Sequence, residues 1–191
     1  MKRIIIILTL CLTLCGWAQA QRYLPGMKGI QVTAGAVDGF TLSNKDGQAF
    51  NVGLALSTYT KSSNRWVWGA EFLQKKHEYK DILIPASQIT AEGGYYHNFL
   101  SDRSKTVFFS FGFSVLAGYE TINWGKTLLA DGATITSKEN FLYGGAVTFE
   151  MEIYMSDHMV LLINARERFL PSSSIQDFHF QYGIGFKYII N

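Results

Sequence analysis

The chain has 191 residues, the size of one ordinary domain. It is 48% hydrophobic, 15% aromatic and 17% charged, with 18 glycines, 3 prolines, 2 cysteines and a formal net charge of +2. This composition excludes a strongly basic nucleic-acid-binding protein, a disulfide scaffold and a disordered chain. The mean hydropathy is near zero, which is too low for a bundle of transmembrane helices.

Residues 1–20 have the pattern of a secretory signal peptide. An apolar run of eleven residues follows Lys2 and Arg3, and residues 18–20 form an Ala-Gln-Ala cleavage site. The run is shorter than the roughly 20 apolar residues that a transmembrane helix needs. We therefore expect a cleaved signal peptide and a mature single domain over residues 21–191. A membrane anchor at the N-terminus is the alternative.

Both cysteines lie inside the expected signal peptide. Cys11 and Cys15 each follow a leucine, where a lipoprotein signal requires a small residue, so a lipid anchor is disfavoured. Cleavage also removes Lys2 and Arg3, which leaves fifteen basic and fifteen acidic residues and a net charge of zero. The mature chain then has no disulfide and no thiol chemistry, and an exported protein must be held by its fold alone.

After the signal peptide, the repeating pattern has a period of two over stretches of about ten residues. This alternation predicts β-strands, because successive side chains of a strand point to opposite faces. The eight expected strands cover residues 28–37, 49–60, 65–73, 87–99, 106–120, 140–154, 159–169 and 178–190.

The connections between these strands alternate in length. The three short ones cover residues 61–64, 101–105 and 156–158, and the four long ones cover residues 38–48, 74–86, 121–139 and 170–177. An even number of strands, with short turns at one end and long loops at the other, is typical of outer-membrane β-barrels. The sequence therefore predicts an all-β protein, an eight-stranded antiparallel up-and-down transmembrane β-barrel in the outer membrane, with its short turns in the periplasm.

The composition of the two strand faces supports a membrane barrel over a secreted soluble barrel or a β-sandwich. One face is almost wholly aromatic and aliphatic, which suits lipid, and the other is mostly Gly, Ala and Ser, which fits a narrow lumen. We expect a charge network in the lumen, formed by Glu71, Glu92, Glu120, Glu150, Glu152, Arg166, Arg168 and Lys187. The expected pairs join Glu150 and Glu152 to Arg166 and Arg168, and Lys187 to another glutamate.

Tyrosine and tryptophan gather near the strand ends, as in the interfacial belts of membrane proteins. The expected belt on the short-turn side contains Tyr59, Trp66, Tyr95, Tyr96, Tyr154 and Tyr188. The expected belt on the long-loop side contains Tyr119, Trp124 and Tyr143. Aromatic residues of a soluble core would give a similar pattern.

The sequence contains no established nucleotide, hydrolase, zinc-protease or calcium motif. The four histidines, His77, His97, His158 and His179, share no metal-ligand spacing, so we expect no metal, cofactor or small-molecule substrate. A lipid-modifying barrel enzyme is the less favoured alternative, because it needs a Ser-His pair facing lipid, whereas His179 is expected to point inward. Glu150 and Glu152 resemble a paired acid and base, but their expected arginine neighbours favour a structural ion network.

Several segments resemble the TraO proteins of Bacteroidetes conjugative transposons. The resemblance covers the whole chain and is carried by residues 1–35, 91–96 and 181–188, with added weight from residues 69–73 and 131–135. It implies an outer-membrane component of a conjugative DNA-transfer apparatus, with outer-membrane lipid and other transfer proteins as partners. It supplies no catalytic residues. A general surface barrel for adhesion or envelope integrity is the alternative function.

The longest expected loop is the strongest candidate for a contact surface. Within residues 121–139, apolar side chains stand where polar ones are usual, namely Trp124, Leu128, Leu129 and Ile135. The alternative is that these side chains cap the mouth of the barrel. A mature chain without net charge provides no electrostatic basis for binding DNA directly, so we expect no nucleic-acid contact.

Overall fold

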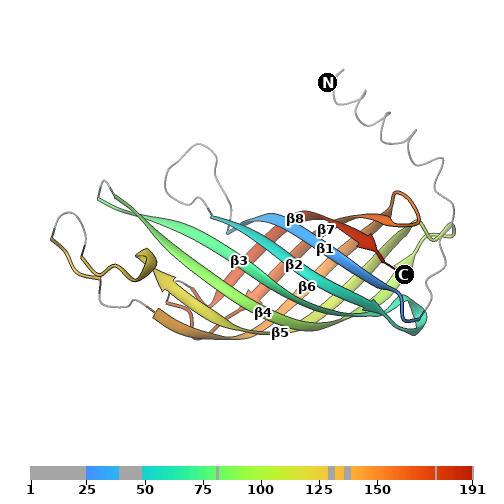
Figure 1. The fold of residues 1–191 in the computed structure, drawn as a ribbon, viewed down its shortest axis with the longest axis horizontal. Helices are drawn as coiled ribbons and strands as arrows, with labels where there is room; N and C mark the ends of the chain where they lie inside the picture. Colours follow the sequence, from blue (N-terminus) through green and yellow to red (C-terminus); the bar gives the residue numbers. More distant parts are fainter. Residues whose placement is uncertain are drawn as a thin grey trace, which may run out of the picture.

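A computed structural model describes residues 25–38, 49–80, 82–128, 132–135, 139–174 and 176–190. The expected signal peptide lies outside these residues. The described residues form eight antiparallel strands in one closed barrel, ordered as in the sequence (Figure 1). The strands are β1 (Lys28–Val37), β2 (Ala49–Tyr59), β3 (Arg65–Tyr79), β4 (Ile82–Ser101), β5 (Val107–Ile122), β6 (Glu139–Tyr154), β7 (Met159–Phe169) and β8 (Phe178–Ile189).

The barrel closes by pairing of the first and last strands. β1 and β8 are antiparallel from Gly29 opposite Ile189 to Val37 opposite Gln181. Every other neighbouring pair is joined directly along the chain, so the topology is up-and-down and leaves no free sheet edge around the barrel. The structure confirms the eight-stranded barrel expected from the sequence. None of the described residues belongs to a helix long and apolar enough to cross a bilayer.

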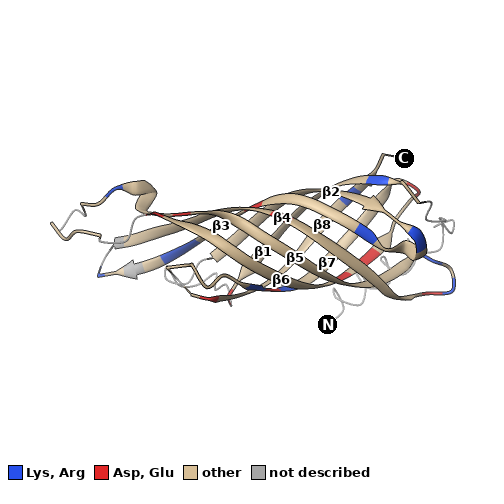
Figure 2. Ribbon diagram, turned by 90° about the horizontal axis from the view of Figure 1, so that it is seen from below, with Lys and Arg blue, Asp and Glu red and all other residues tan. Residues whose placement is uncertain are grey.

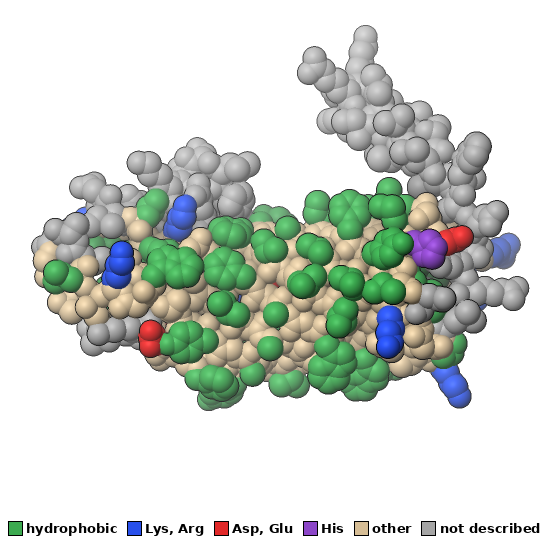
Figure 3. Space-filling view, in the orientation of Figure 1, with side chains coloured by type: hydrophobic (Ala, Val, Ile, Leu, Met, Phe, Trp, Pro, Cys, Tyr) green, Lys and Arg blue, Asp and Glu red, His purple; other side chains and the backbone are tan. Residues whose placement is uncertain are grey.

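Strict alternation along the strands creates the two faces of the wall. In β5, Phe111, Phe113 and Val115 are exposed on the outside, whereas Ser110 and Ser114 are buried inside. Hydrophobic side chains cover the middle of the visible outer face, and the charged side chains seen there lie toward the two ends (Figure 3). An outside of this kind is stable against hydrocarbon, not against water.

The β3–β4 hairpin is longer than expected. The sequence predicts a loop over residues 74–86, but the ladder continues through Lys75 opposite Ala86 and Lys76 opposite Pro85 to Tyr79 opposite Ile82. The hairpin therefore reaches beyond the closed barrel at the long-loop end (Figure 1). The charged residues of this segment interrupt the apolar alternation, because here the strands leave the lipid.

Small interior residues allow the barrel to be narrow. A Cβ atom on Gly112 would lie 2.5 Å from the ring of Tyr96, and one on Gly94 would collide with the hydroxyl of Ser114. Glycine at these two positions therefore makes room for larger side chains from neighbouring strands. As a result, side chains fill the lumen, as expected for eight strands.

Candidate functional site

The lumen contains two clusters of buried charges, and Figure 2 shows charged residues along the strands at several levels of the barrel. In the cluster nearer the short turns, Arg65 from β3 contacts two carboxylates of β6, Glu150 at 2.5 Å and Glu152 at 3.2 Å. Lys187 from β8 also pairs with Glu152. The guanidinium of Arg65 lies 4.7 Å from the centre of the Tyr96 ring. Two cations thus balance two anions in this cluster.

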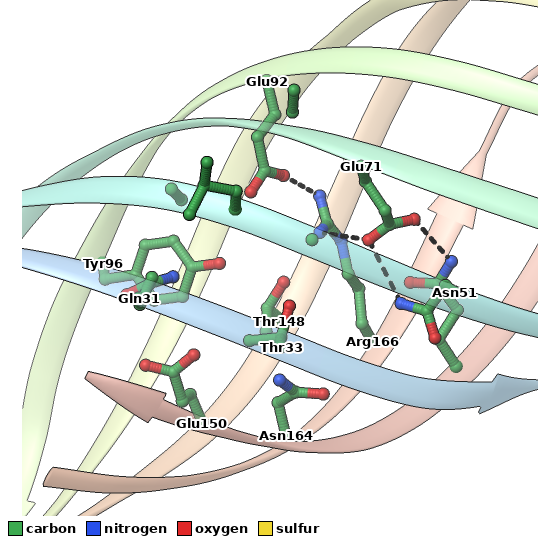
Figure 4. Close-up of a pocket in the computed structure, with 15 residues that line it drawn as sticks. Gln31, Thr33, Asn51, Glu71, Glu92, Tyr96, Thr148, Glu150, Asn164 and Arg166 are labelled. Atoms are coloured by element: carbon green, nitrogen blue, oxygen red, sulfur yellow. Dashed lines mark hydrogen bonds and ion pairs between the residues drawn. The ribbon is translucent and has the colours of Figure 1, made fainter.

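The second cluster lies nearer the long loops and joins β3 and β4 to β7 (Figure 4). Arg168 Nη1 is 2.8 Å from Glu71 Oε1, and Arg166 Nη1 is 3.3 Å from Glu71 Oε2. Arg166 also pairs with Glu92. The Gln181 amide donates a further hydrogen bond of 2.9 Å to Glu71. This cluster also has two cations and two anions.

The ion pairs differ from those expected. Glu150 and Glu152 pair with Arg65 and Lys187, not with the arginines of the adjacent strand. Side chains pair across the lumen, so the partner depends on which strands face each other and not on which are adjacent in sequence. Arg65 is missing from the expected network. Arg65 lies an even number of residues from the inward-facing Glu71 of the same strand, so the alternation of the strand predicts that it also points into the lumen.

The remaining expected member, Glu120, has a different environment. It is buried and accepts hydrogen bonds from Gln88 Nε2 at 2.8 Å, from Ser173 Oγ at 2.9 Å and from the Ser174 amide at 2.9 Å. These serines belong to the β7–β8 loop. Glu120 therefore fixes that loop over the long-loop end of the lumen.

Apolar side chains close the lumen at both ends. Leu170, at the start of the β7–β8 loop, is fully buried against Leu116, Leu142 and Ala146. The short-turn end is closed by a buried cluster of Met27, Tyr59, Phe108, Tyr154, Val160, Leu162 and Ile189. Between the two ends, a cavity of about 30 Å³ lies against both charge clusters. This volume suits single water molecules.

Three tyrosines assigned to the short-turn belt are in the lumen instead. Tyr59, Tyr96 and Tyr154 are 1%, 3% and 4% exposed. The phenol of Tyr59 donates to Glu152 at 3.0 Å. Trp66 and Tyr188 are exposed on the outer face, as the belt requires. Position near a strand end does not determine the face, whereas the alternation within each strand does.

Three polar side chains, those of Asp38, Lys75 and His179, meet at the long-loop end of the barrel. Asp38, just after β1, contacts Lys75 Nζ and His179 Nδ1, both at 3.0 Å, and accepts the amide of Phe180. Partial burial acts to raise the pKa of Asp38, but the hydrogen bonds and charges of His179 and Lys75 outweigh it and lower the pKa to about 2. His179 points inward, as expected, and ties β8 to the end of β1.

The expected contact loop presents apolar side chains to the outside. Trp124 is 59% exposed and Leu128 is 70% exposed, while Ile135 is half-buried and Leu129 lies outside the described residues. Trp124 has a φ of 53°, a left-handed conformation that a bulky residue rarely adopts. The 3-10 turn η3 (Asn123–Gly125) fixes it there. The loop is thus structured near its start, and its two largest described apolar groups point away from the barrel.

The described part of the chain offers no cluster of side chains for metal binding. No group of three or more His, Asp or Glu side chains there is arranged to hold a metal ion. His77, His97 and His158 are exposed, away from the buried His179. The buried carboxylates have cationic or hydrogen-bonding partners that balance them. The arrangement is suited to holding a barrel shut.

The closed eight-stranded barrel and its lipid-type exterior define the class: a small outer-membrane β-barrel protein. The chain belongs to the family described as conjugative transposon protein TraO, whose model matches residues 24–190. A comparison with curated protein sequences finds no match.

Two solved outer-membrane proteins have a similar fold. Neisserial surface protein A has a TM-score of 0.58 at 11% identity, covering 84% of this chain and 96% of that chain. Ail, the attachment invasion locus protein of Yersinia pestis, has a TM-score of 0.54 at 12% identity, covering 87% and 100%. The outer membrane enzyme PagL has a TM-score of 0.41 at 14% identity, covering 84% and 98%, a likeness too weak to bear on activity.

Proposed function

We propose that this protein is a non-catalytic outer-membrane component of a conjugative DNA-transfer apparatus. The family match over residues 24–190 supports a role in conjugation. The filled lumen supports a role for the outer surfaces, because the side chains of an eight-stranded barrel fill its interior and buried ion pairs occupy this one. Export by a signal peptide over residues 1–20, ahead of the mature domain 21–191, is part of the proposal.

The contact surface in this proposal is the β5–β6 loop. Trp124 and Leu128 are both large, apolar and more than half exposed at the long-loop end. Apolar groups exposed to water on a structured loop are typical of protein–protein interaction sites. The partners are accordingly other proteins of the transfer apparatus, with membrane lipid around the barrel wall. No direct contact with DNA is proposed, and no cofactor or small-molecule substrate.

Deletion of the gene from a transfer-competent element tests the role. We expect a lower transfer frequency, restored by the wild-type gene supplied in trans, with growth and detergent sensitivity unchanged. Undiminished transfer would contradict the proposal. Sensitivity of the deletion strain to detergent, with normal transfer, would favour an envelope-integrity role in its place.

Adhesion is the second candidate. The observation that favours it is the same pair of exposed apolar side chains, together with a β3–β4 hairpin that reaches beyond the barrel. The two functions are separated by measuring attachment of cells to surfaces or host matrix alongside transfer. If the deletion reduces attachment of cells when no recipient is present, the result supports adhesion as the function in place of a role in transfer.

A further inference from the structure

A charged side chain interrupts the apolar outer wall of the barrel. In β7, Arg166 and Arg168 point into the lumen, so Glu167 between them points outward, and it is half-buried against its neighbours. The outward positions of β5 to β8 hold only one other charged residue, Glu139, which is the first residue of β6. A carboxylate on a lipid-facing wall is costly and therefore marks a functional position.

Glu167 lies beside a hollow in this wall. The hollow has a volume of about 370 Å³, at the lower end of the usual range for ligand pockets. Gly145 contributes to its floor, because it lacks a side chain at a position that faces outward. The lining residues that matter are Phe113, Gly145, Val147, Glu167, Phe169 and Phe178. The hollow is thus apolar apart from one carboxylate at its side.

No residue in the described part of the chain supplies a counter-charge to this carboxylate. Glu167 makes no hydrogen bond or ion pair to any residue that the structure describes. It lies two residues before the end of β7. The Phe169 and Phe178 rings, with centroids 4.9 Å apart, follow it on the long-loop side. The position is therefore close to the outer headgroup region, where a cationic group on a ligand can reach it.

We propose that this hollow binds a lipid whose acyl chain lies over Gly145 and whose headgroup places a primary amine on Glu167. The hollow is apolar, as an acyl chain requires, and the carboxylate complements an ammonium group that can donate hydrogen bonds. A lipid site of this kind is independent of the transfer role.

A second copy of the chain and a protein segment fit this surface less well. Two barrels in the same orientation that met symmetrically through this face would bring two Glu167 carboxylates together. A stable protein interface needs about 800 Å² of well-packed surface on each partner. Here the hollow is narrow and bordered by protruding rings, with Phe113 64% and Phe178 59% exposed. A flexible chain fills such a surface better than a rigid strand or helix.

The test is a competition between three lipids for the purified, refolded protein. Phosphatidylethanolamine, phosphatidylcholine and phosphatidylglycerol with identical acyl chains are supplied in equal amounts, and retained lipid is counted by native mass spectrometry. Phosphatidylcholine is the key comparison, because its quaternary ammonium has the charge but no N–H donor. For the wild type we expect about fivefold more phosphatidylethanolamine than phosphatidylcholine, which corresponds to about 1 kcal/mol.

Three variants locate the site. Glu167→Gln keeps the shape and should bring the ratio close to one. Gly145→Leu fills the hollow and should lower retention of all three lipids. Ala70→Leu fills a separate outer hollow of about 300 Å³ that has no outward carboxylate, because Glu71 beside it turns into the lumen, and should leave the ratio unchanged. Heat-dependent gel migration verifies that each variant folds.

Several results would contradict the proposed lipid-binding site at Glu167. These are equal retention of the two zwitterionic lipids by the wild type, a preference that survives Glu167→Gln, and a preference for phosphatidylglycerol. Cross-linking through Val147 to a protein, with no lipid retained, would assign the surface to a protein partner and reject the lipid.

Discussion

Replacement of Arg65 by methionine tests whether the buried ion pairs hold the barrel together. Arg65 is fully buried, contacts Glu150 and Glu152, and donates to Ser110 Oγ at 3.2 Å. In Arg65→Met, Glu152 keeps Lys187, but Glu150 loses its cation. Removing one partner of a buried pair costs about 3–5 kcal/mol. Because Arg65→Met leaves only one carboxylate, that of Glu150, without a cation, we expect the unfolding free energy to fall by about 3 kcal/mol.

A second substitution isolates the charge from the packing. Arg65→Met combined with Glu150→Gln leaves one cation and one anion, Lys187 and Glu152, in the same cluster. We expect the double variant to regain about 2 kcal/mol, because no buried charge is then uncompensated. Arg103→Met, in the exposed short turn between β4 and β5, is the control and should change stability by less than about 0.5 kcal/mol.

The assay is urea unfolding of the protein refolded in lipid vesicles, followed by tryptophan fluorescence. Trp66 and Trp68 are 45% and 59% exposed on the outer face of β3, next to Arg65, so they leave lipid for water on unfolding. With a slope of about 2–3 kcal/mol per molar urea, the single variant should lower the midpoint by about 1–1.5 M. An unchanged midpoint, or a double variant no more stable than the single one, would show that the buried ion pairs do not hold the barrel together.

Gly144→Ala should lower the unfolding free energy by about 1–3 kcal/mol in the same assay, because its Cβ atom would collide with the Phe169 carbonyl oxygen. Gly145→Ala should cost less, because its Cβ atom would meet only one oxygen, at 3.3 Å. Equal losses for the two variants would contradict this packing. The pKa of Asp38 is lower in the folded protein, so its stabilising contribution is complete above about pH 4 and is lost toward pH 2. The unfolding free energy of Asp38→Asn should therefore fall less over this range than that of the wild type. Parallel pH curves for the two proteins would argue that Lys75 and His179 do not stabilise the Asp38 carboxylate. In planar bilayers we expect no stable conductance, and large reproducible single-channel steps would contradict the closed lumen.

The strands and their two faces could be predicted from the sequence because each strand repeats with a period of two. In β5 the large residues Phe111, Phe113 and Val115 are all outward, as the alternation requires. The same rule places Tyr96 inward, since it has the parity of Glu92 in its own strand. Assigning tyrosines to a belt by their place near strand ends ignored this parity, and three assignments were wrong for that reason.

The ion pairs could not be predicted from the sequence. Arg65 and Glu150 belong to β3 and β6 and are separated by 85 residues. They meet because the barrel's tilt and stagger bring these strands together across the lumen, and a single sequence contains no direct record of that stagger. The β3–β4 extension was missed for another reason, because a hairpin outside the membrane has no lipid-facing side to impose alternation.

Whether the protein acts in transfer through its outer surface is tested most directly by one mating experiment. The experiment compares a variant of the outer surface with a variant of the lumen. A deletion strain is complemented with Arg65→Met/Glu150→Gln, which alters the lumen, or with Trp124→Ser/Leu128→Ser, which alters the β5–β6 loop, at matched levels in the outer membrane. We predict that the lumen variant restores transfer to the wild-type frequency and that the loop variant does not. Full transfer with the loop variant and a loss with the lumen variant would contradict a protein that acts through its outer surface.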